Sequence, residues 1–140
     1  MKNILFAALA TLALIGCNAN QKSRESDSAS QKGAPVIVAV YSGTIPAADV
    51  AGIRYRILFG DDGRFEMQRK YQASGDDGSQ TEDAGGEYEL VERPGYEAYY
   101  MLKAPGETLY FVQTSDSTIT MTGADLKPAP SGLDYTLSRE

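Results

Sequence analysis

Short runs of alternating apolar and polar residues, separated by turn residues, fill this chain from Val36 to its end. In the clearest run, residues 53–59, apolar side chains take the odd positions and Arg54 and Arg56 take two of the even ones. Because the side chains of a β-strand alternate between the two faces of a sheet, this pattern predicts a strand with one buried face and a solvated arginine face. Further short runs, with no long helical pattern among them, predict an all-β domain.

About eight short strands are expected. They cover residues 36–41, 53–59, 64–73, 87–92, 96–103, 108–113 and 118–122, and a closing strand that contains Leu133, Tyr135 and Leu137. Strands joined by tight turns form a small antiparallel up-and-down β-barrel when the last strand returns beside the first. An open β-sandwich is the alternative.

The segments between the strands carry their own signals. The apolar residues 36–41 predict a buried strand that ends at Gly43 and Pro46, because glycine accepts unusual backbone angles and proline lacks a donor N–H. Residues 47–51 are expected to form a single helical turn, closed by Gly52. Residues 74–86 are polar, glycine-rich and acidic, and predict a long exposed loop.

The N-terminus has the features of an exported lipoprotein. Lys2 precedes an apolar run, residues 4–15, that is too short to span a bilayer and is typical of a secretory signal. Residues 14–17, Leu-Ile-Gly-Cys, resemble a bacterial lipobox, in which the cysteine thiol receives a lipid and becomes the new N-terminus. Since Cys17 is the only cysteine of the chain, we predict lipid attachment there and a signal peptide over residues 1–17. An ordinary signal peptide that happens to contain a cysteine is the alternative.

The residues after the cysteine predict a tether and a location. Residues 18–34 contain no large apolar side chain and cannot offset the entropy of ordering, so we expect a flexible linker and one domain over residues 35–140. Asn18, by resemblance to enteric sorting rules, favours an outer-membrane lipoprotein that faces the periplasm or the cell surface.

Composition excludes several classes of function. The chain has 13 Lys and Arg residues against 19 Asp and Glu residues, a formal net charge of −6, and no basic run, which argues against a nucleic-acid partner. It has no histidine, no nucleophile elbow and no Ser-x-x-Lys motif, so we expect no catalytic residues and no enzymatic activity. We also expect no cofactor.

One stretch carries a family resemblance. Residues 41–53, Tyr-Ser-Gly-Thr-Ile-Pro-Ala-Ala-Asp-Val-Ala-Gly-Ile, resemble the signature of the NlpE-like copper-resistance lipoproteins, which reads roughly Tyr-x-Gly-x-Leu-Pro-Cys-Ala-Asp-Cys-x-Gly-Ile. Weaker similarity continues at residues 61–65, 86–88 and 133–137. The resemblance implies a lipocalin-like barrel and a role in envelope stress signalling or copper tolerance, through contact with another envelope protein. The matching motif residues are Tyr41, Gly43, Pro46, Asp49 and Gly52.

The chain departs from that family at its metal ligands. Ala47 and Val50 stand where the family has its two cysteines, so we expect no thiolate copper site and no metal site of the family's kind. The remaining soft ligands of the domain are Met67, Met101 and Met121, which are expected to face inward. They form either a methionine copper site or, more simply, part of the hydrophobic core.

Tyrosines offer a candidate ligand pocket. We expect Tyr41, Tyr55, Tyr71, Tyr88 and Tyr99 to share the barrel interior. There they either line a cavity for a small hydrophobic ligand or fill the core, and the small size of the domain favours the filled core. Asp49 is expected to cap the short turn after the first strand. The other expected contacts are the membrane, through the lipid, and an envelope protein, through exposed loops such as 46–52 or 74–86.

Overall fold

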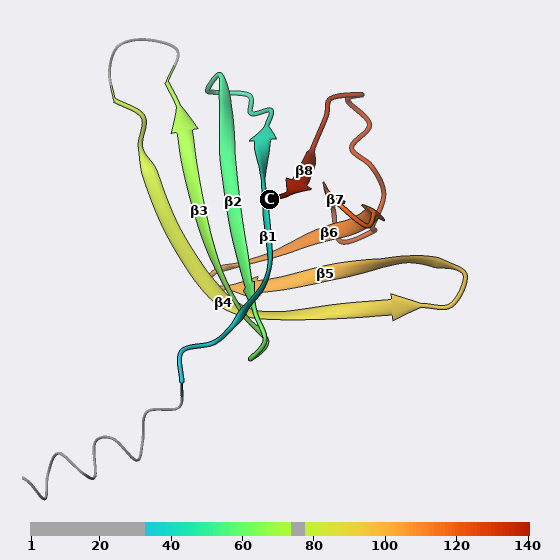
Figure 1. Ribbon diagram of the computed structural model, residues 1–140. Coiled ribbons are helices and arrows are strands. Elements are labelled where there is room, and N and C mark those ends of the chain that lie inside the picture. Colours follow the sequence, from blue (N-terminus) through green and yellow to red (C-terminus); the bar gives the residue numbers. More distant parts are fainter. Residues whose placement is uncertain (1–32, 74–77) are drawn as a thin grey trace, which may run out of the picture. The chain divides into compact units, whose positions relative to one another are not determined.

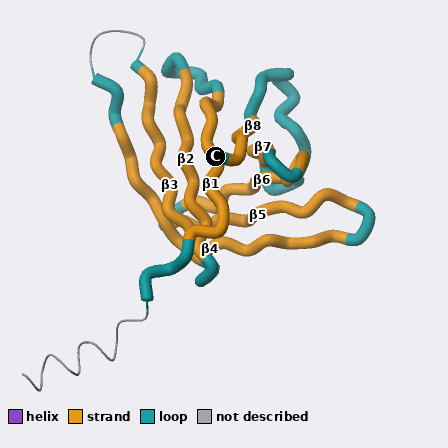
Figure 2. Tube along the Cα trace, in the orientation of Figure 1, coloured by secondary structure: helices purple, strands orange, loops and turns teal. Residues whose placement is uncertain are grey.

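The alternating runs become strands of a single sheet in a computed structural model, which describes residues 33–73 and 78–140 (Figures 1 and 2). Cys17, most of the linker and the acidic pair Asp76 and Asp77 lie outside the described residues. Among the described residues there are eight strands and no helix. Within this part of the chain, no helix is therefore long and apolar enough to cross a membrane.

Each strand pairs with the next in antiparallel fashion. The strands are β1 (Ile37–Ile45), β2 (Gly52–Gly60), β3 (Arg64–Gln72), β4 (Thr81–Arg93), β5 (Tyr96–Ala104), β6 (Glu107–Ser115), β7 (Thr118–Thr122) and β8 (Thr136–Arg139). Because β8 also pairs with β1, the sheet closes into a barrel in the order β1 to β8. The predicted up-and-down β-barrel is confirmed, and the open sandwich is not formed.

Side chains from all eight strands fill the barrel interior. In β2 the predicted alternation is confirmed, since Ile57 and Phe59 are fully buried while Arg54 and Arg56 are exposed. The buried core consists of Tyr41, Ile45, Tyr55, Ile57, Phe59, Phe65, Met67, Tyr100, Leu102, Phe111, Ile119 and Leu137. Residues Pro35–Glu140 thus form one compact unit around one core.

The barrel closes where β1 meets the short strand β8. Only Tyr41 and Ser42 of β1 have ladder partners there, namely Arg139 and Ser138. Gly43, which was expected to end the first strand, lies inside β1 instead. A Cβ atom at Gly43 would lie 2.9 Å from the carbonyl oxygen of Thr136 and 3.0 Å from a methyl group of Leu137. The glycine is therefore needed for close approach of β8, and Pro46 is the residue that follows the end of β1.

The first residues of β1 are not the buried strand that their composition predicts. Val36, directly before β1, is 64% exposed, and Ile37 and Val38, its first two residues, are 44% and 47% exposed. The ladder with β8 does not extend back to these residues, so they have β2 on one side only. An apolar run alone could not reveal this missing neighbour.

Strand β4 begins earlier than the sequence indicates. Its residues 81–87 pair with β3 and residues 87–93 pair with β5, so one long strand turns from one half of the barrel to the other (Figure 1). The expected exposed loop 74–86 is therefore wrong from Thr81 onward. Gly86 lies at the turn of the strand, where a Cβ atom would collide with the carbonyl oxygen of Lys103.

Two smaller segments also differ from the predictions. Residues 48–51 form a bend rather than a helical turn, and the Ala51 N–H donates to the carbonyl oxygen of Gln72 at 3.1 Å. The sheet thus uses a backbone donor that a helical turn would have needed for itself. The closing strand contains Leu137 but begins only at Thr136, and Leu133 lies before it, 56% exposed.

We expect Gly43→Ala to destabilise the barrel by about 1 to 3 kcal/mol, because the added methyl group overlaps β8 at the closure. Urea unfolding followed by tyrosine fluorescence measures the effect. Thr44→Ala, at the exposed neighbouring position, serves as the control and should change stability by less than about 0.5 kcal/mol. Equal stability of Gly43→Ala and the parent chain would show that β8 does not need this close approach.

Candidate functional site

Arg69 is the one charged residue among the buried side chains of the described chain. It lies on the inward face of β3 together with Phe65 and Met67, and it is 9% exposed. No motif in the sequence points to this residue. The alternation in residues 64–73 was nevertheless a usable signal, because Arg69 has the same parity as its buried neighbours on β3.

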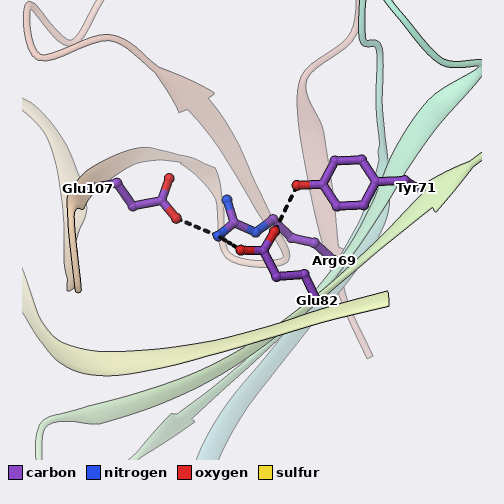
Figure 3. A network of polar contacts seen from close by, with 4 residues as sticks. All are labelled: Arg69, Tyr71, Glu82 and Glu107. Carbon is purple, nitrogen blue, oxygen red and sulfur yellow. Dashed lines mark hydrogen bonds and ion pairs between the residues drawn. The ribbon is translucent and has the colours of Figure 1, made fainter. Parts of the chain in front are cut away.

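Two carboxylates neutralise this arginine (Figure 3). Its Nη2 donates to Oε1 of Glu107 at 2.5 Å and to Oε1 of Glu82 at 3.4 Å. The Tyr71 hydroxyl donates to the other oxygen of Glu82 at 2.9 Å. The network therefore joins side chains of β3, β4 and β6.

The network spans a place where the backbone ladder is interrupted. Residues 81–86 of β4 pair with β3, but within the described chain none of them pairs with β5, whose ladder with β4 begins at the pair Glu87–Lys103. Glu107 lies at the start of β6 and reaches across to Arg69. The ion pair thus links β3 to the β5–β6 turn, two segments that are not joined by the backbone hydrogen bonds of the ladder.

The electrostatics of the cluster are those of a structural ion pair. Burial disfavours the charged guanidinium, but the hydrogen bond and charge of Glu107, with the charge of Glu82, raise the pKa of Arg69. Burial raises the pKa of Tyr55, against the opposing charge of Arg69. The hydrogen bond to Glu82 raises the pKa of Tyr71. Although Nε of Arg69 is buried without a partner, two carboxylates against one cation do not favour a further anionic ligand.

A second group of inward side chains is aromatic. The ring of Phe59 lies 4.7 Å from those of Tyr88 and Tyr100 and 6.1 Å from that of Tyr41, measured between centroids. The Tyr88 hydroxyl donates to the carbonyl oxygen of Gly60 at 2.8 Å. Burial, with the neighbouring Tyr41, raises the pKa of Tyr100 to about 12. These rings occupy the volume that a ligand would need.

Four of the five tyrosines predicted to share the barrel interior face inward, in two groups. Tyr41 and Tyr88 belong to the aromatic group, and Tyr55 and Tyr71 lie on the inward face with Arg69. Tyr99 faces outward, so its predicted inward position is wrong. In β5 the buried residues are Tyr100 and Leu102, of the opposite parity. Residues 98–102 are all apolar or aromatic, so alternation could not decide which face is buried.

The methionines are not gathered inside the barrel. Met67 is buried in the core and Met121 packs against it partly buried. Met101 has the parity of Tyr99 and lies on the outer face, so its predicted inward position is also wrong. Within residues 33–73 and 78–140, no group of three or more His, Cys, Asp or Glu side chains is arranged to hold a metal ion.

The family-motif residues divide between the barrel wall and the loop beyond it. Tyr41 is buried and Gly43 lies at the closure, while Gly52 is the buried first residue of β2. Pro46 and Asp49 lie in the loop between β1 and β2, where Asp49 is exposed. The motif therefore shapes a strand–loop–strand corner and presents its acidic residue to solvent.

Two hollows lie on the outer face of β2, β3 and β4. One has a volume of about 570 Å³ and includes Pro35, and the other, of about 610 Å³, includes Arg56. Leu58, Glu66 and Gly85 line both. Neither hollow is the barrel interior that a lipocalin-like carrier would use.

The fold and its packed interior define a small antiparallel β-barrel domain. The family model described as the NlpE N-terminal domain matches residues 41–132. The chain belongs to this family, as the motif resemblance indicated.

Two solved structures are similar to the barrel. The Cpx pathway activator NlpE from Escherichia coli aligns with 71% of this chain at 21% identity and a TM-score of 0.55. The alignment covers 50% of that protein, so the present chain spans about half its length. A candidate lipoprotein from Shewanella oneidensis aligns with 72% of this chain and 86% of its own, at 17% identity and a TM-score of 0.56. At these identities the likeness shows the fold. A search of curated proteins gives no significant match.

We expect Glu107→Gln to destabilise the barrel by about 1 to 3 kcal/mol, since it removes the main partner of a buried cation. Glu87→Gln, a matched change at an exposed glutamate, should be within about 0.5 kcal/mol of the parent chain. Urea unfolding at pH 7 provides both values. If the two variants lose equal stability, the Arg69–Glu107 pair does not hold the β5–β6 turn.

Proposed function

We propose that this chain is a membrane-anchored lipoprotein of the cell envelope that acts by contact with another envelope protein and not by catalysis. The observation that carries the proposal is the order of its parts. A family-matched NlpE barrel follows a lipobox cysteine, Cys17, after a polar linker over residues 18–34. Its relative in Escherichia coli is described as an activator of the Cpx pathway, and we propose a related role in envelope stress signalling.

The packing of the barrel supports a surface function. Three large interior side chains, Tyr41, Phe59 and Phe111, are at most 1% exposed. The interior cation is paired with carboxylates of the same chain. A filled barrel leaves the outer face and the loops for recognition, and the loop between β1 and β2, with the exposed Asp49, carries the family motif. The same packing argues against a role for this protein as the carrier of a small hydrophobic ligand.

The sequence of this loop bears on copper tolerance. Ala47 and Val50 replace the two cysteines of the family motif, and the whole chain has no histidine. Copper(I) prefers thiolate, thioether or imidazole ligands. We therefore propose that the chain lacks the thiolate copper site of its family, and that any part in copper tolerance is indirect.

The location proposed is the outer membrane, with the barrel facing the periplasm or the cell surface. Lipid on Cys17 would fix the protein there, because each buried CH₂ of an acyl chain contributes about 0.8 kcal/mol. The linker would let the barrel reach a partner some distance from the bilayer, since a polar coil of this length spans about 20 to 25 Å.

Metabolic labelling with palmitate tests the anchor. The parent chain, expressed in a bacterial host, should incorporate the label and sediment with membranes, whereas Cys17→Ser should do neither. Ser23→Ala, in the linker, is the matched control and should behave as the parent. Equal labelling of Cys17→Ser and parent, or membrane association without any label, would contradict the proposal.

A further inference from the structure

The second half of β4 has a free edge. The ladder between β3 and β4 ends at the pair Arg64–Glu87, whereas the ladder between β4 and β5 continues to Arg93. In the described part of the chain, residues 89–93 therefore have a neighbouring strand on one side only. Figure 1 shows this half of β4 running out along the margin of the sheet, away from β3.

The backbone groups that face this edge can be assigned from one hydrogen bond. The Tyr88 N–H donates to the carbonyl oxygen of Gly63 at 2.8 Å, on the side of β4 away from β5. In an antiparallel strand the N–H and C=O groups of every second residue point the same way. The register shift between Val91 and Arg93 places its extra residue on β5, so β4 keeps this alternation. The groups of Leu90 and Glu92 therefore point outward, where no described strand lies.

The side chains along the edge combine apolar and acidic chemistry. Leu90 is 42% exposed, which is unusual for a residue with the parity of the inward-facing Tyr88. Val91 is half-buried, and Glu89 and Glu92 on either side of this apolar pair are exposed. Arg93, at the end of β4, donates to the Glu97 carbonyl oxygen at 3.0 Å and lies over two tyrosine rings.

We propose that this edge binds an extended segment of a partner protein as an additional β-strand, with basic residues opposite Glu89 and Glu92 and apolar residues opposite Leu90 and Val91. Main-chain hydrogen bonds to Leu90 and Glu92 supply the affinity, and the flanking carboxylates select the partner's charge. The inference rests on the proposed function, in which the protein acts through protein contact, and it names the surface and the partner's chemistry.

Charge favours a basic partner over a second copy of the chain. Each copy carries a formal net charge of −6, and pairing two such edges would bring Glu89 and Glu92 of both copies together. Charged side chains on a free edge are a common means of preventing self-association. Here the same charges serve recognition of an oppositely charged strand.

A peptide-binding experiment with the full-length lipoprotein in neutral detergent tests the proposal. The probe is a fluorescent peptide, capped at both ends, with a Lys-Val-Val-Lys centre between Thr and Ser residues. Fluorescence anisotropy measures its affinity, and hydrogen exchange measured by mass spectrometry reports on residues 88–95. We expect saturable binding with at least tenfold slower exchange in that segment, and at least tenfold weaker binding of a Glu-Val-Val-Glu peptide.

Matched charge reversals locate the contact. The double variant Glu89→Lys and Glu92→Lys should weaken binding at least tenfold. Asp116→Lys with Asp125→Lys, which makes the same charge change at exposed positions elsewhere, should change it less than twofold. The proposal fails if the basic peptide does not bind, if both double variants weaken it equally, or if residues 88–95 exchange at an unchanged rate. It also fails if light scattering shows that the parent chain is a dimer and that the double variant Glu89→Lys and Glu92→Lys is a monomer, because the edge would then be covered by a second copy. None of these results depends on lipid attachment, so failure here and failure of palmitate labelling are distinguishable.

Discussion

The close contact between β1 and β8 turns an eight-stranded sheet into a closed barrel. Two residue pairs complete the barrel there, and the absence of a side chain at Gly43 lets the last strand reach the first. Closure places Tyr41 of β1 and Leu137 of β8 in the same core. Without it, the sheet would have two unpaired edges, at β1 and β8, and an interior open to water.

A closed and filled barrel limits where function can lie. The interior holds packed aromatic and aliphatic side chains. Its one buried cation among the described residues, Arg69, is paired with Glu82, its ladder partner on β4, and with Glu107 across an interruption in the ladder. The interior polar groups therefore hold the fold together. What the chain offers to other molecules is its surface: the loop that carries the family motif, the grooves over β2 to β4, and the free edge of β4.

Local patterns were sufficient to predict the fold class, but not every strand or site. Residues 53–59 alternate clearly, and the predicted strand matches β2 within a residue at each end. Residues 81–86 form the first half of β4 with few apolar side chains, so only pairing with β3 defines them as a strand. The sequence does not show which face of β5 is buried, because both faces carry apolar side chains. The pairing of Arg69 with Glu107, 38 residues apart, depends on tertiary structure that no local pattern encodes.

In the function proposed here, the protein provides a position and a surface, with its interior occupied by its own side chains. Native mass spectrometry of the protein, purified gently from the membranes of cells that express it, tests this proposal. We expect one mass for the chain, that of residues from Cys17 onward with the acyl groups, and no bound small molecule or metal ion. A co-purifying lipid, other small molecule or copper ion that dissociates only on unfolding would contradict it.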